Sequence, residues 1–310
     1  MARRRSVALT MPHFSTILRK EEDAEDLIQS LTKGTVRGLR SAVREFSVRS
    51  LVVIRDLLDG RGEPAKGQDA IDLGMLIADA LLDSGLEDVA KDFRKDFKKV
   101  EEAGLEYFDV FASEMAKPGF DVTDIRAFAT VQEQAFLDLA DQRLVQPMRD
   151  AVLNGILGNR DSDTIMADVR RIMDERGILT RDRIGFTDTQ LETLVEDSYR
   201  RYYRVTKMTQ ANELGMEVIW FQGPDDDLTS DQCRFLLTKA PHGVPNMWLK
   251  EEFTTELHPA LKQDPLVAGG HWNCRHTVNP VTLGFAESMG FRAPGSVPDD
   301  DEVAENAEEL

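Results

Sequence analysis

The sequence predicts a mainly α-helical protein in which long helices are followed by a small mixed α/β module with a cysteine and histidine cluster. Two observations support this fold class. Apolar residues recur at helical spacings over long stretches before Gly215, whereas β-branched and aromatic residues, then cysteine and histidine, follow that glycine. We find no run of roughly 20 uncharged apolar residues, the length that a membrane span requires. We therefore expect no membrane-spanning segment.

Three long helical regions are predicted in the first half of the chain. In each region apolar side chains recur three and four residues apart, and glycine or proline ends the run. The regions are Glu22 to Leu58, with a break allowed near Gly34; Asp69 to Met115, with interruptions allowed at Gly85 and Gly104; and Thr123 to Ile156, with a kink or boundary at Pro147. We assign the aromatic residues of these regions to helix packing rather than to a cofactor pocket.

Shorter elements are predicted after the long helices. We expect a helix from Ser162 to Glu175 and another from the capping box at Thr187 to Gly215. Strands are expected at Met216 to Phe221 and at about His276 to Asn279.

These elements divide the chain into four expected parts. They are a flexible basic arm (1–20), a helical domain (21–185), a module that contains the cysteine and histidine cluster (186–285) and an acidic disordered tail (286–310). The tail is assigned from its carboxylates and its near lack of apolar anchors.

The formal net charge of −18 argues against a protein that wraps nucleic acid, because phosphate binding depends on lysine and arginine. Two basic clusters are candidates for local DNA contact, namely Arg3 to Arg5 and the set Arg200, Arg201, Arg204 and Lys207. We favour a solvated arm for the first cluster and a polar helix face for the second.

Soft metal ligands are concentrated in one part of the chain. Both cysteines, and every histidine except His13, fall between Cys233 and His276. Thiolates and imidazoles are the ligands that zinc prefers, and the short spacings from His271 to Cys274 and His276 allow these side chains to converge. We therefore predict a structural zinc site with the ligands Cys233, His271, Cys274 and His276.

Two other interpretations of the cysteines are open. Cys233 can be a small buried core residue while the histidines lie at the surface. Alternatively, Cys233 and Cys274 can form a disulfide, which needs an oxidising compartment. The residues after Arg5 supply no apolar stretch long enough for a signal-peptide core, so we expect no secretion by that route.

Several motifs follow one another in a characteristic order between Thr187 and Val281. They are a helix ending in Glu213-Leu214-Gly215, a strand with Trp220, the turn Asp226-Asp227-Leu228-Thr229, then Cys233, then Gly270-His271-Trp272-Asn273-Cys274-Arg275-His276 and Pro280. This order resembles the head-morphogenesis or minor capsid family of tailed phages, of the phage Mu type. The resemblance covers the last third of the chain.

Three positions depart from the family pattern. Leu236 stands where family members often carry a second cysteine, Trp272 replaces a proline, and His276 replaces the final cysteine. The last change preserves the capacity to bind a metal, since histidine is also a zinc ligand. If one of the four predicted ligands does not bind, His242 or His258 could complete the set.

The resemblance implies a non-enzymatic minor component of the phage head, present in multiple copies and active in assembly in the host cytoplasm and in the virion. The implied partners are the portal protein or the major capsid protein, with scaffolding components and packaged DNA as further candidates. An acidic surface would favour basic partner proteins.

The main competing class is a metal-dependent nuclease or other hydrolase that uses His271, Asn273 and His276, with Asp226 or Asp227 as oxygen ligands. Catalytic zinc needs an open coordination position, whereas a site with four cysteine and histidine ligands is closed. The chain also contains no Gly-x-Ser-x-Gly, phosphate-cradling loop or His-Glu-x-x-His motif. A toxin-like effector and a host-side adaptor that shares a metal-stabilised module are two further competing classes.

Overall fold

The computed structural model describes residues 12–59, 75–77, 79–111, 123–158, 160–175, 186–270 and 274–294. The described part is mainly helical and contains a small antiparallel sheet near the carboxyl end, which confirms the predicted fold class. None of the described helices is both long enough and apolar enough to cross a membrane. The chain divides into two compact units, each built from separate stretches of sequence.

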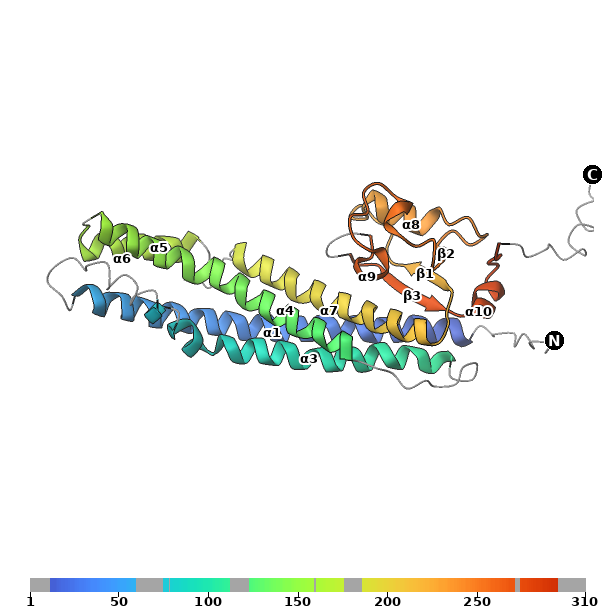
Figure 1. Cartoon of the computed structure of the whole chain (residues 1–310), viewed down its shortest axis with the longest axis horizontal. Helices are drawn as coiled ribbons and strands as arrows, with labels where there is room; N and C mark the ends of the chain where they lie inside the picture. Colours follow the sequence, from blue (N-terminus) through green and yellow to red (C-terminus); the bar gives the residue numbers. More distant parts are fainter. Residues whose placement is uncertain are drawn as a thin grey trace, which may run out of the picture. The chain divides into compact units, whose positions relative to one another are not determined.

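The first unit, here called the helical unit, comprises the described residues of 22–103 and 121–203. Its helices are most of α1 (Pro12–Asp59) and α3 (Glu87–Glu106), then α4 (Thr123–Ala140), α5 (Gln146–Leu157), α6 (Ser162–Glu175) and the first part of α7 (Phe186–Glu213). Helices α1, α3, α4 and α7 lie side by side (Figure 1). Aromatic rings of α3, α4 and α7 pack together, and Thr35 of α1 hydrogen-bonds to the hydroxyl of Tyr199 in α7.

The aromatic core of the helical unit explains this packing. Phe93 of α3 lies 5.5 Å from Phe136 of α4 and 5.2 Å from Tyr199 of α7, measured between ring centroids. Phe97 lies 4.8 Å from Tyr202. Ring pairs at these separations add to the free energy gained by burying the rings. The phenylalanines of α3 therefore form core, as the helical spacing predicted.

Two of the four predicted interruptions of the long helices are found, at Gly85 and near Pro147, whereas those at Gly34 and Gly104 are not. Helix α1 continues through Gly34 without a break. Hydrogen bonding becomes π-helical over Leu82–Leu86, around Gly85, and α3 then continues through Gly104. Pro147 lies in the first turn of α5, directly after a π-helical turn at Asp141–Val145, so the predicted boundary is a local change of hydrogen bonding within a continuous helical segment.

The second unit, here called the sheet unit, comprises the described residues of 1–21, 104–120 and 204–310. Its sheet has the order β2-β1-β3, with β1 (Val218–Gln222) antiparallel to both β2 (Met247–Leu249) and β3 (Thr277–Val281). The helices α8 (Asp231–Thr238), α9 (Pro265–Ala268) and α10 (Leu283–Ser288) belong to it, together with the end of α7. Strands β1 and β3 match the two predicted strands, whereas β2 and the short helices were not predicted.

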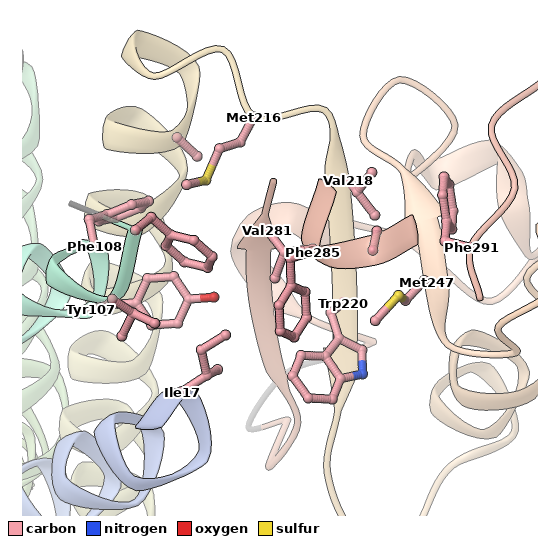
Figure 2. Close-up of a cluster of buried hydrophobic side chains, with 14 residues drawn as sticks. Ile17, Tyr107, Phe108, Met216, Val218, Trp220, Met247, Val281, Phe285 and Phe291 are labelled. Carbon is pink, nitrogen blue, oxygen red and sulfur yellow. The ribbon is translucent and has the colours of Figure 1, made fainter. Parts of the chain in front are cut away.

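Both faces of this sheet are buried. Val218 and Trp220 point to one face and pack with Ile17, Tyr107 and Phe285 (Figure 2). The intervening residues of β1 point to the other face, as strand geometry requires. There they form a second core with side chains from α7, α8, β2, β3 and the connecting segments. Its members are Met208, Ile219, Phe221, Cys233, Leu236, Trp248, Phe253, Leu261, Cys274 and Val278.

Some parts of the sheet unit come from outside the expected module 186–285. Helix α1 begins at Pro12, inside the segment 1–20 that was expected to be a flexible arm, because Phe14 packs on Trp220 and Ile17 is buried. Similarly, α10 and the buried Phe291 extend into the segment 286–310 that was expected to be a tail. The hydrophobic spacing of a helix predicts that one face is buried but not which partner covers it.

The second basic cluster proves to be largely buried. Arg200 pairs with Glu25 and Glu196, and Arg201 lies 2.6 Å from a carboxylate oxygen of Asp197. Arg204 and Lys207 are 3% and 0% exposed. This cluster is therefore neither a DNA-binding patch nor a polar helix face.

We expect Phe97→Ala to lower the free energy of unfolding by about 3 to 5 kcal/mol, because it removes a fully packed ring and leaves a cavity. The measurement is urea denaturation followed by circular dichroism. Leu157→Ala is the control, since the Leu157 side chain is 79% exposed and its truncation leaves no cavity. Equal destabilisation by the two substitutions would contradict the core assigned to the helical unit.

Candidate metal centre

Three of the four predicted ligands come together in the sheet unit. The Sγ atoms of Cys233 and Cys274 are 3.6 Å apart, and the Cys274 sulfur lies 3.4 Å from Nδ1 of His276. Among the residues that the structure describes, these three form a group whose donor atoms all lie within 4.8 Å of one another. All three side chains are buried, so this group could hold a metal ion.

Helix α8 supplies Cys233. Ser230 caps this helix by accepting a hydrogen bond from the backbone N–H of Cys233, which places the cysteine in the first turn. The chain then returns close to the sulfur at Gly270. A Cβ at residue 270 would collide with Sγ of Cys233, so only glycine allows this approach.

Arg204 of α7 holds the segment that carries Cys274 and His276. Its buried guanidinium donates to the carbonyl oxygens of Cys274 at 2.7 Å and His276 at 2.9 Å, and to that of Val267 at 3.3 Å. The backbone N–H of Gly270 donates to the Cys274 sulfur at 3.3 Å. These bonds orient the Cys274 side chain toward Cys233.

The His276 ring is fixed in orientation and in tautomer. Nε2 lies 2.9 Å from the carbonyl oxygen of Pro224, which can only accept, so Nε2 carries the proton and Nδ1 presents its lone pair to the sulfurs. Metal-binding histidines commonly donate their second N–H in this way. The ring also stacks on Phe221 at 5.1 Å, and Gly223 leaves no Cβ to collide with it.

The spacing of the donor atoms fits zinc. Around one tetrahedral zinc ion two thiolate sulfurs are about 3.8 Å apart, and a sulfur and an imidazole nitrogen are about 3.6 Å apart. The observed separations of 3.6 Å and 3.4 Å are close to these values. A disulfide has its sulfurs about 2.05 Å apart, whereas both cysteines are free in this structure.

The two thiols share a proton unequally. The hydrogen bond from Cys233, helped by the positive charge of Arg204, lowers the pKa of Cys274 despite its burial. The same hydrogen bond and burial raise the pKa of Cys233. Both directions favour the thiolate at Cys274, and the thiolate is the form of cysteine that binds metals.

An ion pair lies next to the cluster in sequence. Arg275, between Cys274 and His276, donates to both carboxylate oxygens of Asp226, at 2.7 Å and 3.1 Å. Asp226 also accepts from the backbone N–H of Leu228 and from the Thr229 hydroxyl, and that hydroxyl donates to the carbonyl of Pro224. The turn Asp226 to Thr229 therefore links two parts of the site. Thr229 binds the carbonyl of Pro224, which also binds His276, and Asp226 binds Arg275.

The other candidate ligands have separate surroundings. His271 and Asn273, with Trp272, lie outside the described residues. His242 is 2.7 Å from a carboxylate oxygen of Glu252, and the His258 ring packs against Phe235. Neither His242 nor His258 belongs to the group of donors.

Three elements of the site were not predicted from the sequence: Arg204, Arg275 and the carbonyl of Pro224. Arg275 stands inside the motif that carries the resemblance and could have been found there. Arg204 had a weaker signal, because it stands in a cluster that resembles a polar helix face. A backbone carbonyl gives no signal in the sequence.

Hydrogen bonds from Arg275, with further donors in the turn, lower the pKa of Asp226 from 3.8 to about 2. Because the folded pKa is the lower one, the ion pair stabilises the protein above pH 3.8 and loses this effect as the pH falls through about 2. We expect carboxyl-detected NMR titration to give a midpoint near 2 for Asp226, and Arg275→Gln to move it toward 3.8. Lys250→Gln, which removes another charge from the sheet unit, is the control and should leave the midpoint low. An Asp226 midpoint that is the same with and without Arg275 would disprove the pair.

Comparisons of the chain with protein-family models, with curated proteins and with solved structures give no match. The function is therefore inferred from the chemistry of the Cys233, Cys274 and His276 cluster and from the order of motifs around it.

Proposed function

We propose that the sheet unit contains a structural zinc site and that the protein is a minor head protein of a tailed phage. One observation carries the proposal. Cys233 and Cys274 belong to the motifs that carry the resemblance to the head-morphogenesis family, and they are buried beside His276, which stands where that family has its final cysteine. The turn at Asp226 to Thr229, also part of the resemblance, holds the segment around them.

His271 is the proposed fourth ligand. Its neighbour Gly270 lies close to both sulfurs. A Cβ at this position would collide with Sγ of Cys233, and the Gly270 N–H donates to Sγ of Cys274. His271 follows Gly270 directly in the sequence, and we therefore propose its imidazole as the remaining donor. Two thiolates and two imidazoles would complete a closed tetrahedral zinc site.

Zinc at this position would stabilise the sheet unit. Structural zinc binds peptides with an apparent free energy of about 10 to 16 kcal/mol at pH 7, and this becomes folding free energy when the site exists only in the folded state. The ligands come from α8 and from the segment before β3, so the ion would join two stretches separated by 41 residues. Binding would displace the proton that the two thiols share.

The surroundings of the cluster favour a structural role over hydrolysis. Catalytic zinc keeps one open position for water, whereas the donors here are buried and rich in thiolate. The carboxylate of Asp226, which a nuclease would use as an oxygen ligand, is bound by Arg275 instead. Among the described residues no carboxylate belongs to the group of donors.

In a phage head the long helices would supply interaction surface, and the zinc site would hold the loop-rich sheet unit in one conformation. The net charge of −18 suits contact with basic surfaces of the portal or major capsid protein. The same proposal includes the presence of multiple copies in each head. It also includes contact with scaffolding components or with packaged DNA.

We expect elemental analysis of the purified protein to find zinc in a stoichiometric amount. Cys233→Ser, Cys274→Ser, His276→Ala and His271→Ala should each reduce the zinc content and lower the melting temperature. Cobalt substitution should give the absorption spectrum of a tetrahedral site with thiolate ligands. His258→Ala is the matched control, because it removes an imidazole outside the cluster and should retain zinc. A wild-type protein that binds neither ion would overturn the metal site.

We expect mass spectrometry of purified phage particles to detect the protein, and genes for a portal and a large terminase to lie beside its gene. Particles that form normally and never contain the protein would overturn the head assignment without affecting the zinc site. A nuclease assay on the zinc-loaded protein, with His276→Ala as control, tests the hydrolase alternative.

A further inference from the structure

A lysine, an asparagine and a glutamate meet inside the sheet unit, away from the sulfur cluster. Nζ of Lys207 lies 2.7 Å from Oδ1 of Asn279 and 2.7 Å from Oε1 of Glu21. Lys207 and Asn279 are 0% exposed and Glu21 is 8% exposed. We propose that Lys207 and Asn279 form an intramolecular isopeptide bond, with Glu21 as the acid and base that moves the proton.

The geometry brings a nucleophile to an oriented amide. The Asn279 side chain donates from Nδ2 to the side-chain oxygens of Gln222, at 2.6 Å, and Thr277, at 3.0 Å. These two bonds leave Oδ1 facing the lysine. Holding two reacting groups in this way replaces a collision between separate molecules and can raise the effective concentration to about 10⁵ M or more.

Burial favours the neutral amine of Lys207, whereas the Glu21 carboxylate and the face of the Tyr107 ring favour its ammonium form. Nζ of Lys207 lies 4.8 Å from the centre of the Tyr107 ring, whose hydroxyl donates to the carbonyl of Pro280. Figure 2 shows Tyr107 among the buried apolar side chains of this region. Burial lowers the pKa of Lys207 to about 8, although the charge of Glu21 opposes this change. A minor fraction of this amine is therefore neutral at pH 7, and this fraction grows as the pH rises past about 8. A desolvated neutral lysine is a nucleophile.

The reaction needs no oxidant and no added reactant. The lone pair of Lys207 Nζ attacks Cγ of Asn279, and the new N–C bond forms. Glu21 takes a proton from Nζ and returns it to Nδ2. The Cγ–Nδ2 bond then breaks and ammonia leaves, so the chain loses one ammonia and keeps its oxidation state. General acid and base catalysis of this kind contributes about 10² to 10⁴ to a rate.

The residue after Asn279 removes a competing reaction. Asparagine usually loses ammonia when the next backbone N–H attacks its side chain, but Pro280 has no N–H. An ammonia loss at Asn279 without hydrolysis therefore points to an attack from Lys207. The resulting bond would join α7 to β3, 72 residues apart in sequence, and would not require the metal or the phage role.

Intact-mass spectrometry of the purified full-length protein tests the proposal. We expect a mass lower than that of the sequence by one ammonia. Trypsin should fail to cleave after Lys207, and peptides 205–234 and 276–292 should be recovered joined. A wild-type protein that keeps the full sequence mass after long incubation at pH 8 or above would overturn the proposal.

Three variants separate the bond from other causes of mass loss. Lys207→Arg keeps the positive charge and should retain its full sequence mass, as should Glu21→Gln. Asn279→Asp should lose water instead of ammonia and give a cross-linked product of the same mass as the wild-type product. Loss of ammonia that persists in Lys207→Arg would assign it to another asparagine and overturn the proposal.

Discussion

The buried guanidinium of Arg204 is the interaction on which the arrangement of the sheet unit depends. It binds the backbone carbonyls on both sides of Arg275 and so fixes the segment that presents Cys274 and His276. A guanidinium has five N–H donors in a rigid fork, and here these donors satisfy carbonyls that enter a buried region without strand partners. Loss of this side chain would leave those carbonyls unpaired, which costs more than the hydrogen bonds themselves contribute. The candidate metal centre therefore depends on Arg204 of helix α7 as well as on the residues that would bind the ion.

Helix α7 carries charge into the interior of both units. Its cations Arg200 and Lys207 find carboxylates from helix α1, at Glu25 and Glu21. Pairs of this kind are a poor source of net stability, because desolvation offsets their attraction. They do impose specificity, since a shift of one helix along the other would leave a buried charge alone. In the sheet unit Lys207, Glu21 and Asn279 lie together in one buried site. This proximity is the condition for a reaction between Lys207 and Asn279.

The cluster of Cys233, Cys274 and His276 and the cluster of Lys207, Asn279 and Glu21 are associated with opposite faces of one small sheet. The cysteines join the core that includes Ile219 and Phe221, whereas Tyr107 joins the core that includes Val218 and Trp220. Strand β3 takes part in both, because Val278 packs with the sulfurs and Asn279 bonds Lys207. A sheet of three short strands buries little surface by itself. A metal on one face and a covalent bond on the other would each compensate for its size.

The sequence by itself determined the fold class, most of the long helices, strands β1 and β3, and three donors of the candidate site. These features depend on local periodicity and on ligand chemistry, which a single stretch of chain can express. Only the tertiary structure decided that residues 12–21 and 104–111 join the sheet unit, that the basic residues of α7 are buried, and that Arg204 and Pro224 support the donors. Each of these outcomes depends on a partner far away in the sequence, as in the bond from Tyr107 to Pro280. A charged side chain is buried only where a distant residue supplies a hydrogen-bonding or oppositely charged partner. The local sequence pattern does not indicate whether such a partner exists.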